Sequence, residues 1–96
     1  MLLNNIGCFT LNDHFTLMMA DACTSDGFIV GLHPLIVAEG GMTVIEMTIP
    51  YWLDPFDWDS AISFNRNNVK NSGSPDPVLA VKYSERVMEL IKSRRS

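Results

Sequence analysis

Lysine and arginine are absent from residues 1–65 of this 96-residue sequence, although the same stretch contains eight acidic residues. All seven Lys and Arg residues lie in residues 66–96, together with three acidic residues. This distribution argues against direct nucleic-acid binding, which needs a basic patch in contact with phosphates. Two interpretations stay open. Either the basic C-terminal part packs across the acidic part of the same molecule, or an acidic face meets a basic partner protein.

Long apolar runs are also missing. No run of apolar residues exceeds four, as at Leu35–Ala38, so none is long enough for a transmembrane helix. The sequence starts without the basic and apolar regions of a secretory signal, and we therefore expect a cytoplasmic protein. Its two cysteines, Cys8 and Cys23, are then expected to be buried, reduced thiols. A content of 47% apolar and 19% charged residues predicts one globular domain over residues 1–96.

Motifs for catalysis, phosphate binding and metal binding are lacking as well. Residues typical of zinc sites are few and far apart in the sequence: Cys8, His14, Cys23 and His33. No nucleophile elbow, Walker lysine or Gly-x-Gly-x-x-Gly run occurs. We therefore expect no metal, no cofactor and no enzymatic activity.

The C-terminal part contains the clearest secondary-structure signal. Asp76 and Pro77 are typical of a helix start, and apolar residues then recur at helical spacing. This pattern predicts a helix over about 77–93. Its apolar stripe consists of Leu79, Tyr83, Val87, Leu90 and Ile91.

A β-hairpin is predicted over about 28–49. β-Branched and apolar residues dominate both halves, with Glu39, Gly40 and Gly41 as the turn between them. Pro34 cannot donate a ladder hydrogen bond, so the first strand should be an edge strand or carry a bulge near His33. Both faces of the return strand, 42–49, are largely apolar, which favours a central position in the sheet.

The remaining stretches are less clear. Ile6–Leu11 can form a strand, and 13–23 is predicted to be helical because its centre, Leu17–Ala20, contains good helix formers. The alternative is a hairpin whose turn is Asn12-Asp13. A short helix is predicted over 55–64, and 66–76 is predicted to be a polar loop. The fold class is therefore α+β: a small antiparallel sheet packed against the C-terminal helix, with one or two shorter helices.

Residues 51–59, called here the 51–59 segment, are the best candidate for a binding site. The segment interleaves aromatic residues with three aspartates and has no basic residue. It lacks the central glycine and distal glutamate of an EF-hand loop. Its aromatic residues can either pack into this protein's own core or anchor a partner that carries Arg or Lys. The candidate partner-binding residues are Trp52, Asp54, Phe56, Asp57, Trp58 and Asp59.

These features favour a small acidic inhibitor or modulator that occupies a basic surface of a partner protein. Immunity proteins, antitoxins and phage anti-defence proteins are of this general type. The alternative is a structural or assembly subunit, including a homodimer, whose apolar surfaces are buried between protomers. The two hypotheses differ in the salt dependence of association, which should be steep only for the electrostatic inhibitor.

Overall fold

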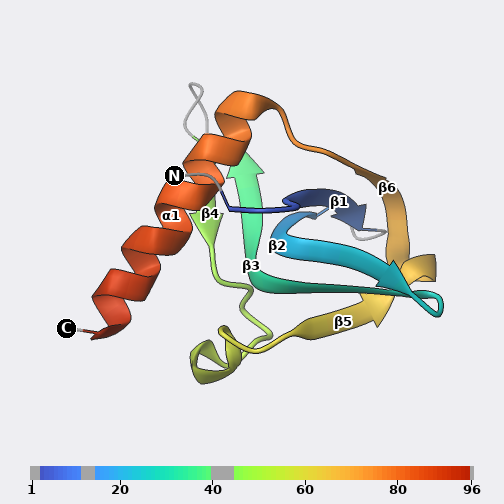
Figure 1. Ribbon diagram of the computed structural model, residues 1–96, viewed down its shortest axis with the longest axis horizontal. Helices are drawn as coiled ribbons and strands as arrows, with labels where there is room; N and C mark the ends of the chain where they lie inside the picture. Colours follow the sequence, from blue (N-terminus) through green and yellow to red (C-terminus); the bar gives the residue numbers. More distant parts are fainter. Residues whose placement is uncertain (1–2, 12–14, 40–44, 96) are drawn as a thin grey trace.

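Six antiparallel strands and one long helix make up the part of the chain that the computed structural model describes, residues 3–11, 15–39 and 45–95 (Figure 1). The predicted α+β class is confirmed. In chain order the strands and the helix are β1 (Gly7–Leu11), β2 (Thr16–Ser25), β3 (Phe28–Glu39), β4 (Ile45–Thr48), β5 (Ile62–Asn65), β6 (Val69–Gly73) and α1 (Pro77–Arg95). Two short 3-10 turns, η2 (Pro55–Asp57) and η3 (Arg66–Asn68), come before and after β5.

The long strand β3 organises the sheet. The strand order is β4-β3-β2-β1-β6, and β5 pairs with β3 as well. β2 lies along one edge of β3, while β4 pairs with residues 36–39 and β5 with residues 28–31. β4 and β5 therefore share the other edge of β3. The chain between them, residues 49–61, leaves the sheet and returns to it, and this excursion contains the 51–59 segment.

β2 and β3 both carry a bulge where the sheet bends. His33 and Pro34 together lie opposite Met19, because Leu32 pairs with Ala20 and Leu35 with Met18. His33 has a left-handed backbone with φ 52°. The predicted bulge near His33 and Pro34 is confirmed, and its cause is the missing N–H of Pro34.

One face of the sheet packs against α1. Tyr83 and Val87 on the helix are fully buried against Met18 and Leu35, and Leu79, Leu90 and Ile91 pack around them. The predicted helix over about 77–93 and its apolar stripe are therefore confirmed. Figure 1 shows α1 lying across this face of the sheet.

The opposite face forms a second apolar cluster. Phe9, Leu17, Met19 and Ile29 are its buried members, and partly buried side chains of β5 and β6 pack against them. Those strands belong to the two ends of the sheet and are joined through η3 (Figure 1). The sheet therefore curls around this second cluster. One face of the sheet is covered by α1, and the other is covered by the curled ends of the sheet itself.

The predicted helix over 13–23 is wrong, and the hairpin alternative is right. Residues 16–25 form β2, which pairs antiparallel with β1, the strand expected near Ile6–Leu11. The proposed turn residues Asn12 and Asp13 lie outside the described residues. Consecutive residues Leu17, Met18, Met19 and Ala20 are all buried, alternating between the two clusters. A strand covered on both faces can bury such a run, and this packing outweighs helix propensity.

Three further expectations need correction. The helix over 55–64 is limited to η2, and residues 62–65 form β5. The expected loop over 66–76 contains η3 and β6. β4 is an edge strand rather than a central one. Its edge is partly covered, because Arg86 Nε on α1 donates a hydrogen bond of 2.9 Å to the Met47 carbonyl. The hairpin of β3 and β4 is confirmed, while its turn, 40–44, lies outside the described residues.

Two valines on α1 test the packing of the helix. Val87 is fully buried and Val81 is exposed. We expect Val87→Ala to lower the free energy of unfolding by about 2 kcal/mol, because it removes buried methyl groups and leaves a cavity. Val81→Ala should change it by less than about 0.5 kcal/mol. Urea unfolding curves provide the measurement, and equal losses for both variants would show that the face assigned to the core is wrong.

Candidate partner-binding surface

The 51–59 segment is shaped by a proline turn and a capped 3-10 turn. Leu53 N–H donates to the Pro50 carbonyl at 3.1 Å, which starts the excursion from the sheet. Asp54 Oδ1 then accepts a hydrogen bond of 2.9 Å from Phe56 N–H, and Pro55 follows this cap directly. Asp54 and Pro55, on which the predicted helix over 55–64 is based, therefore do start a helical turn. That turn is only the short η2, which ends at Asp57. Trp58, the next residue, is fully buried.

Trp58 connects the segment to the bulge in β3. Its indole Nε1 donates a hydrogen bond of 2.9 Å to the carbonyl oxygen of Pro34, and its ring lies 4.7 Å from the ring of His33. A carbonyl displaced from the ladder by a bulge must find another donor when it is buried. Trp58 provides that donor. Of the two roles considered for the aromatic residues, this ring therefore has the core role, and it does not face a partner.

A second donor reaches the same bulge from α1. The hydroxyl of Tyr83 donates a hydrogen bond of 2.6 Å to the carbonyl oxygen of His33. Burial raises the pKa of Tyr83 far above its ordinary value; a backbone hydrogen bond with Ala20 partly offsets this increase, and the nearby carboxylate of Asp21 adds to it. A tyrosine hydroxyl is protonated at neutral pH even without a shift, and the raised pKa keeps this one a donor at alkaline pH as well. The bulge thus holds both the helix and the 51–59 segment.

The other aromatic side chains of the segment face solvent. Tyr51 is 82% exposed, Phe56 is 86% exposed and Trp52 is 50% exposed. The rings of Tyr51 and Trp52 meet edge to face, with centroids 5.2 Å apart. Aromatic residues bury large areas when they bind and are enriched at interfaces. Their exposure here, on a segment held by Trp58, is the strongest structural indication of a binding surface.

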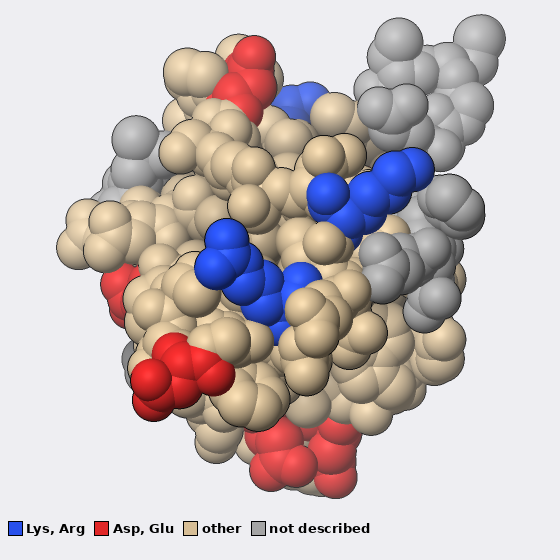
Figure 2. All heavy atoms as spheres, turned by 90° about the vertical axis from the view of Figure 1, so that its right-hand side faces the viewer, with Lys and Arg blue, Asp and Glu red and all other residues tan. Residues whose placement is uncertain are grey.

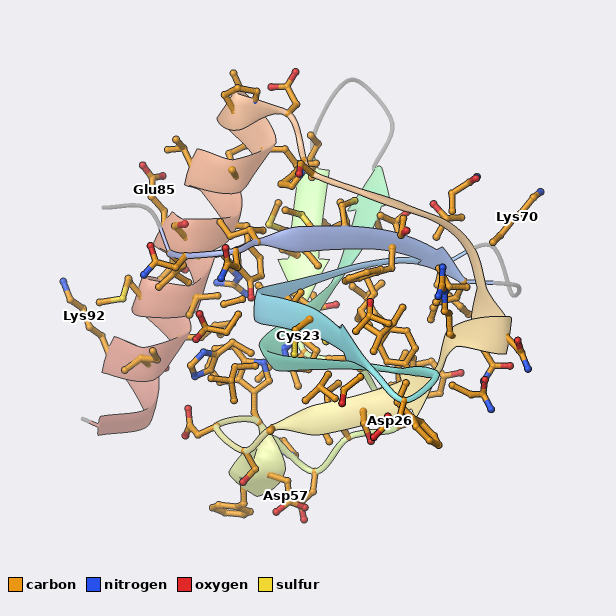
Figure 3. The ribbon with its side chains drawn as sticks, turned by 45° about the vertical axis from the view of Figure 1, so that its right-hand side comes forward. Cys23, Asp26, Asp57, Lys70, Glu85 and Lys92 are labelled. Carbon is orange, nitrogen blue, oxygen red and sulfur yellow. The ribbon has the colours of Figure 1, made fainter. Side chains whose placement is uncertain are left out.

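The three carboxylates of the segment have different surroundings. Asp54 caps η2, and Asp59 Oδ1 lies 3.1 Å from His33 Nε2. Asp57 points outward from η2, away from both Lys70 on β6 and Lys92 on α1 (Figure 3). Of the three, Asp57 is therefore the one whose charge can be changed with the least effect on the local structure.

The surface charge is unevenly distributed. Figure 2 shows the side of the molecule that carries β6, where Lys and Arg side chains lie across the middle. Acidic groups lie at the lower end of this view, the end at which Figure 1 places η2, and also at its upper end and left edge. On the helix, Arg86 pairs with Glu89 of the same helix at 2.6 Å rather than with an acid from residues 1–65. The η2 end therefore carries negative charge at its surface.

Two grooves adjoin the segment, and sequence patterns did not indicate either of them. The first, of about 660 Å³, lies between residues 51–53 and β5. The second, of about 860 Å³, lies between η2 and the C-terminal half of α1 and includes His33 and Asp59. Their walls come from elements far apart in the sequence, so no local pattern could have revealed them.

The cysteines and the possible metal ligands show no assembled site. Cys8 and Cys23 are free, and burial raises the pKa of the Cys8 thiol. Cys23 is exposed, contrary to the expectation that both thiols are buried. Within the described ranges, no three His, Cys, Asp or Glu side chains are grouped so that they could hold a metal ion. His14 lies outside these ranges. No helix in the described part of the chain is long and apolar enough to cross a membrane.

Comparisons with known proteins do not assign the chain to a family. The chain matches no protein-family model, and no curated protein has significant sequence similarity to it. Its function therefore has to be inferred from the geometry and charge of this surface.

Two tyrosines test the role of the bulge. Tyr83→Phe removes the hydroxyl that donates to the His33 carbonyl and changes little else. We expect this change to lower the free energy of unfolding by about 1–3 kcal/mol, because a partly buried acceptor loses its donor. Tyr51→Phe removes a hydroxyl from an exposed ring and should cost less than about 0.5 kcal/mol. If chemical unfolding shows the same stability for both variants, the bulge does not depend on Tyr83.

Proposed function

We propose that this protein is a small inhibitor or modulator that binds a basic surface of a partner protein through the 51–59 segment. The observation that carries the proposal is the pairing of solvent-exposed aromatic rings with outward carboxylates on one anchored segment. Tyr51, Trp52 and Phe56 are exposed, while Trp58 holds the segment to β3. Exposed rings supply apolar contact area, and carboxylates beside them favour Arg and Lys on the partner.

The anchoring of the segment supports a role in binding. A loop that must become ordered on binding loses part of its interaction energy to conformational entropy. Here Asp54 caps η2 and Trp58 bonds to Pro34, so the segment has a defined shape before any partner arrives. A preorganised surface of this kind binds more tightly for the same contact area.

The negative charge of the 51–59 segment limits the kind of partner that it can bind. The segment has three aspartates and no basic residue, so it would repel the phosphates of a nucleic acid and attract a basic protein. Free thiols at Cys8 and Cys23 suit a reducing compartment, and the proposed site of action is the cytoplasm. Nothing in the proposed role needs a cofactor or a catalytic group.

One charge reversal tests this function against a matched control. Asp57→Lys reverses an outward charge on the segment, and Glu85→Lys makes the same change on the exposed side of α1 (Figure 3). Each tagged variant is used to capture proteins from a lysate of the cells that produce it, at about 0.05 M and 0.5 M salt. We expect Asp57→Lys to lose the captured basic protein by about tenfold or more at low salt, and Glu85→Lys to keep it.

The unfolding midpoint of both variants should stay close to that of the original protein. An exposed charge near a helix end, as at Asp57, contributes only about 0.3–1 kcal/mol, and an exposed position within a helix, as at Glu85, usually changes stability by less than about 0.5 kcal/mol. Equal capture by both variants would exclude the segment as an electrostatic binding surface. Self-association that resists high salt would instead favour the assembly subunit.

A further inference from the structure

The groove beside β5 is lined mainly by apolar and aromatic residues, as is typical of a pocket that binds an apolar side chain. Its lining comes from Tyr51, Trp52 and Leu53, from residues 62–64 of β5, and from Leu11, Phe15 and Asn68. Among the residues that the structure describes, none that lines the groove is charged. Leu17 and Phe64, which belong to the second apolar cluster, also line it. Its volume of about 660 Å³ lies in the range of sites that hold apolar groups.

The groove runs along an edge of β5. Three consecutive residues of the strand, Ile62, Ser63 and Phe64, all line it. Alternate residues of a strand point to opposite faces, so a cavity lined by all three lies at the strand's edge. The other edge of β5 pairs with β3. An extended segment of a partner can therefore lie beside β5 and place one side chain in the groove.

Two charged residues that adjoin lining residues or β5 in the sequence, Asp54 and Arg66, give this groove a polarity. Asp54 directly follows the lining residue Leu53, whereas Asp59, three residues before the strand, lines the second groove and lies against His33. Arg66 follows the other end of the strand and begins η3. A bound segment would therefore place its Lys or Arg residues toward Asp54 and the 51–53 part of the groove, and away from Arg66. The second groove, near α1, contains the paired His33 and Asp59 and lacks this uncharged lining.

We infer that the groove along β5 receives one large apolar side chain from an extended segment of the partner, next to Lys or Arg residues of that segment. This inference rests on the proposed function and adds the chemistry that the partner must carry. The aromatic or aliphatic side chain would contact Trp52 and Phe64, while the basic residues would face the carboxylates of the 51–59 segment.

A random linear peptide library, displayed on phage and selected on the purified protein, tests the inference. We expect the enriched peptides to combine a large aromatic or aliphatic residue with neighbouring Lys or Arg. Replacing that apolar residue by Ala should weaken the peptide's affinity about tenfold or more, as for a buried anchor. In two-dimensional NMR spectra the indole signal of Trp52 should shift on binding. The signal of buried Trp58 should move much less.

Two serine variants locate the site. Ser63 and Ser72 are both exposed strand residues, but of the two only Ser63 lines this groove. Ser63→Phe should fill the groove and weaken the selected peptide about tenfold, while Ser72→Phe should leave its affinity within about twofold. Unfolding midpoints confirm that both variants fold. If Ser63→Phe does not fold, Ser63→Leu makes the same test.

The possible failures are distinguishable. Enriched peptides that are basic but lack a required apolar residue would overturn this inference and leave the proposed function standing. A selection without enriched basic peptides would contradict both. Binding of a neutral aromatic compound at Trp52 in the absence of any enriched peptide would assign the groove to a small molecule and overturn the inference.

Discussion

The hydrogen bonds at the His33–Pro34 bulge hold the rest of the structure in place. Pro34 cannot donate to the ladder, and the bulge displaces two carbonyl groups from regular pairing. Tyr83 from α1 donates to one of them and the indole of Trp58 donates to the other. The helix, the sheet and the 51–59 segment therefore meet at a single pair of residues. The bulge at Pro34 is thus the place where the helix, the sheet and the 51–59 segment contact one another.

The hydrogen bonds at the bulge explain why some residues of the 51–59 segment are buried and others are exposed. Trp58 and Pro50 are buried and fix the path of the chain, whereas Tyr51 and Phe56 remain exposed between them. A flexible loop would have to order its aromatic residues on binding, at a cost in conformational entropy. Here the core contact is already made within the chain. The exposed rings and Asp57 can therefore act as a preformed surface for a basic partner, which is the role we propose.

Much of the fold was predictable from local signals, and the errors have physical causes. The helix that starts at Pro77 has a cap, a proline and an apolar stripe, all of which are local features. The hairpin of β3 and β4 and the bulge at Pro34 follow from local patterns as well. The sequence predicts a helix where β2 forms, because Leu17–Ala20 are apolar on both faces of the strand, which removes the alternation that identifies a strand.

For the candidate site, the sequence does not distinguish which aromatic residues of the 51–59 segment are buried and which are exposed. Trp52 and Trp58 lie six positions apart in similar surroundings, and only the long-range contact with Pro34 decides which is buried. The groove along β5 depends on β2, β5 and the 51–53 turn together, so local sequence carries no signal for it.

The most direct test of this account is the hydrogen exchange of the two tryptophan indole groups, measured by NMR on the uniformly labelled protein. If the bulge anchors the segment, the indole N–H of Trp58 exchanges only when the core opens, with protection comparable to that of the most stable backbone amides. The indole N–H of Trp52 should then exchange orders of magnitude faster, because its ring is half exposed. Fast exchange at both indoles would show that the segment is not held by Trp58, and the account of a preformed binding surface would be wrong.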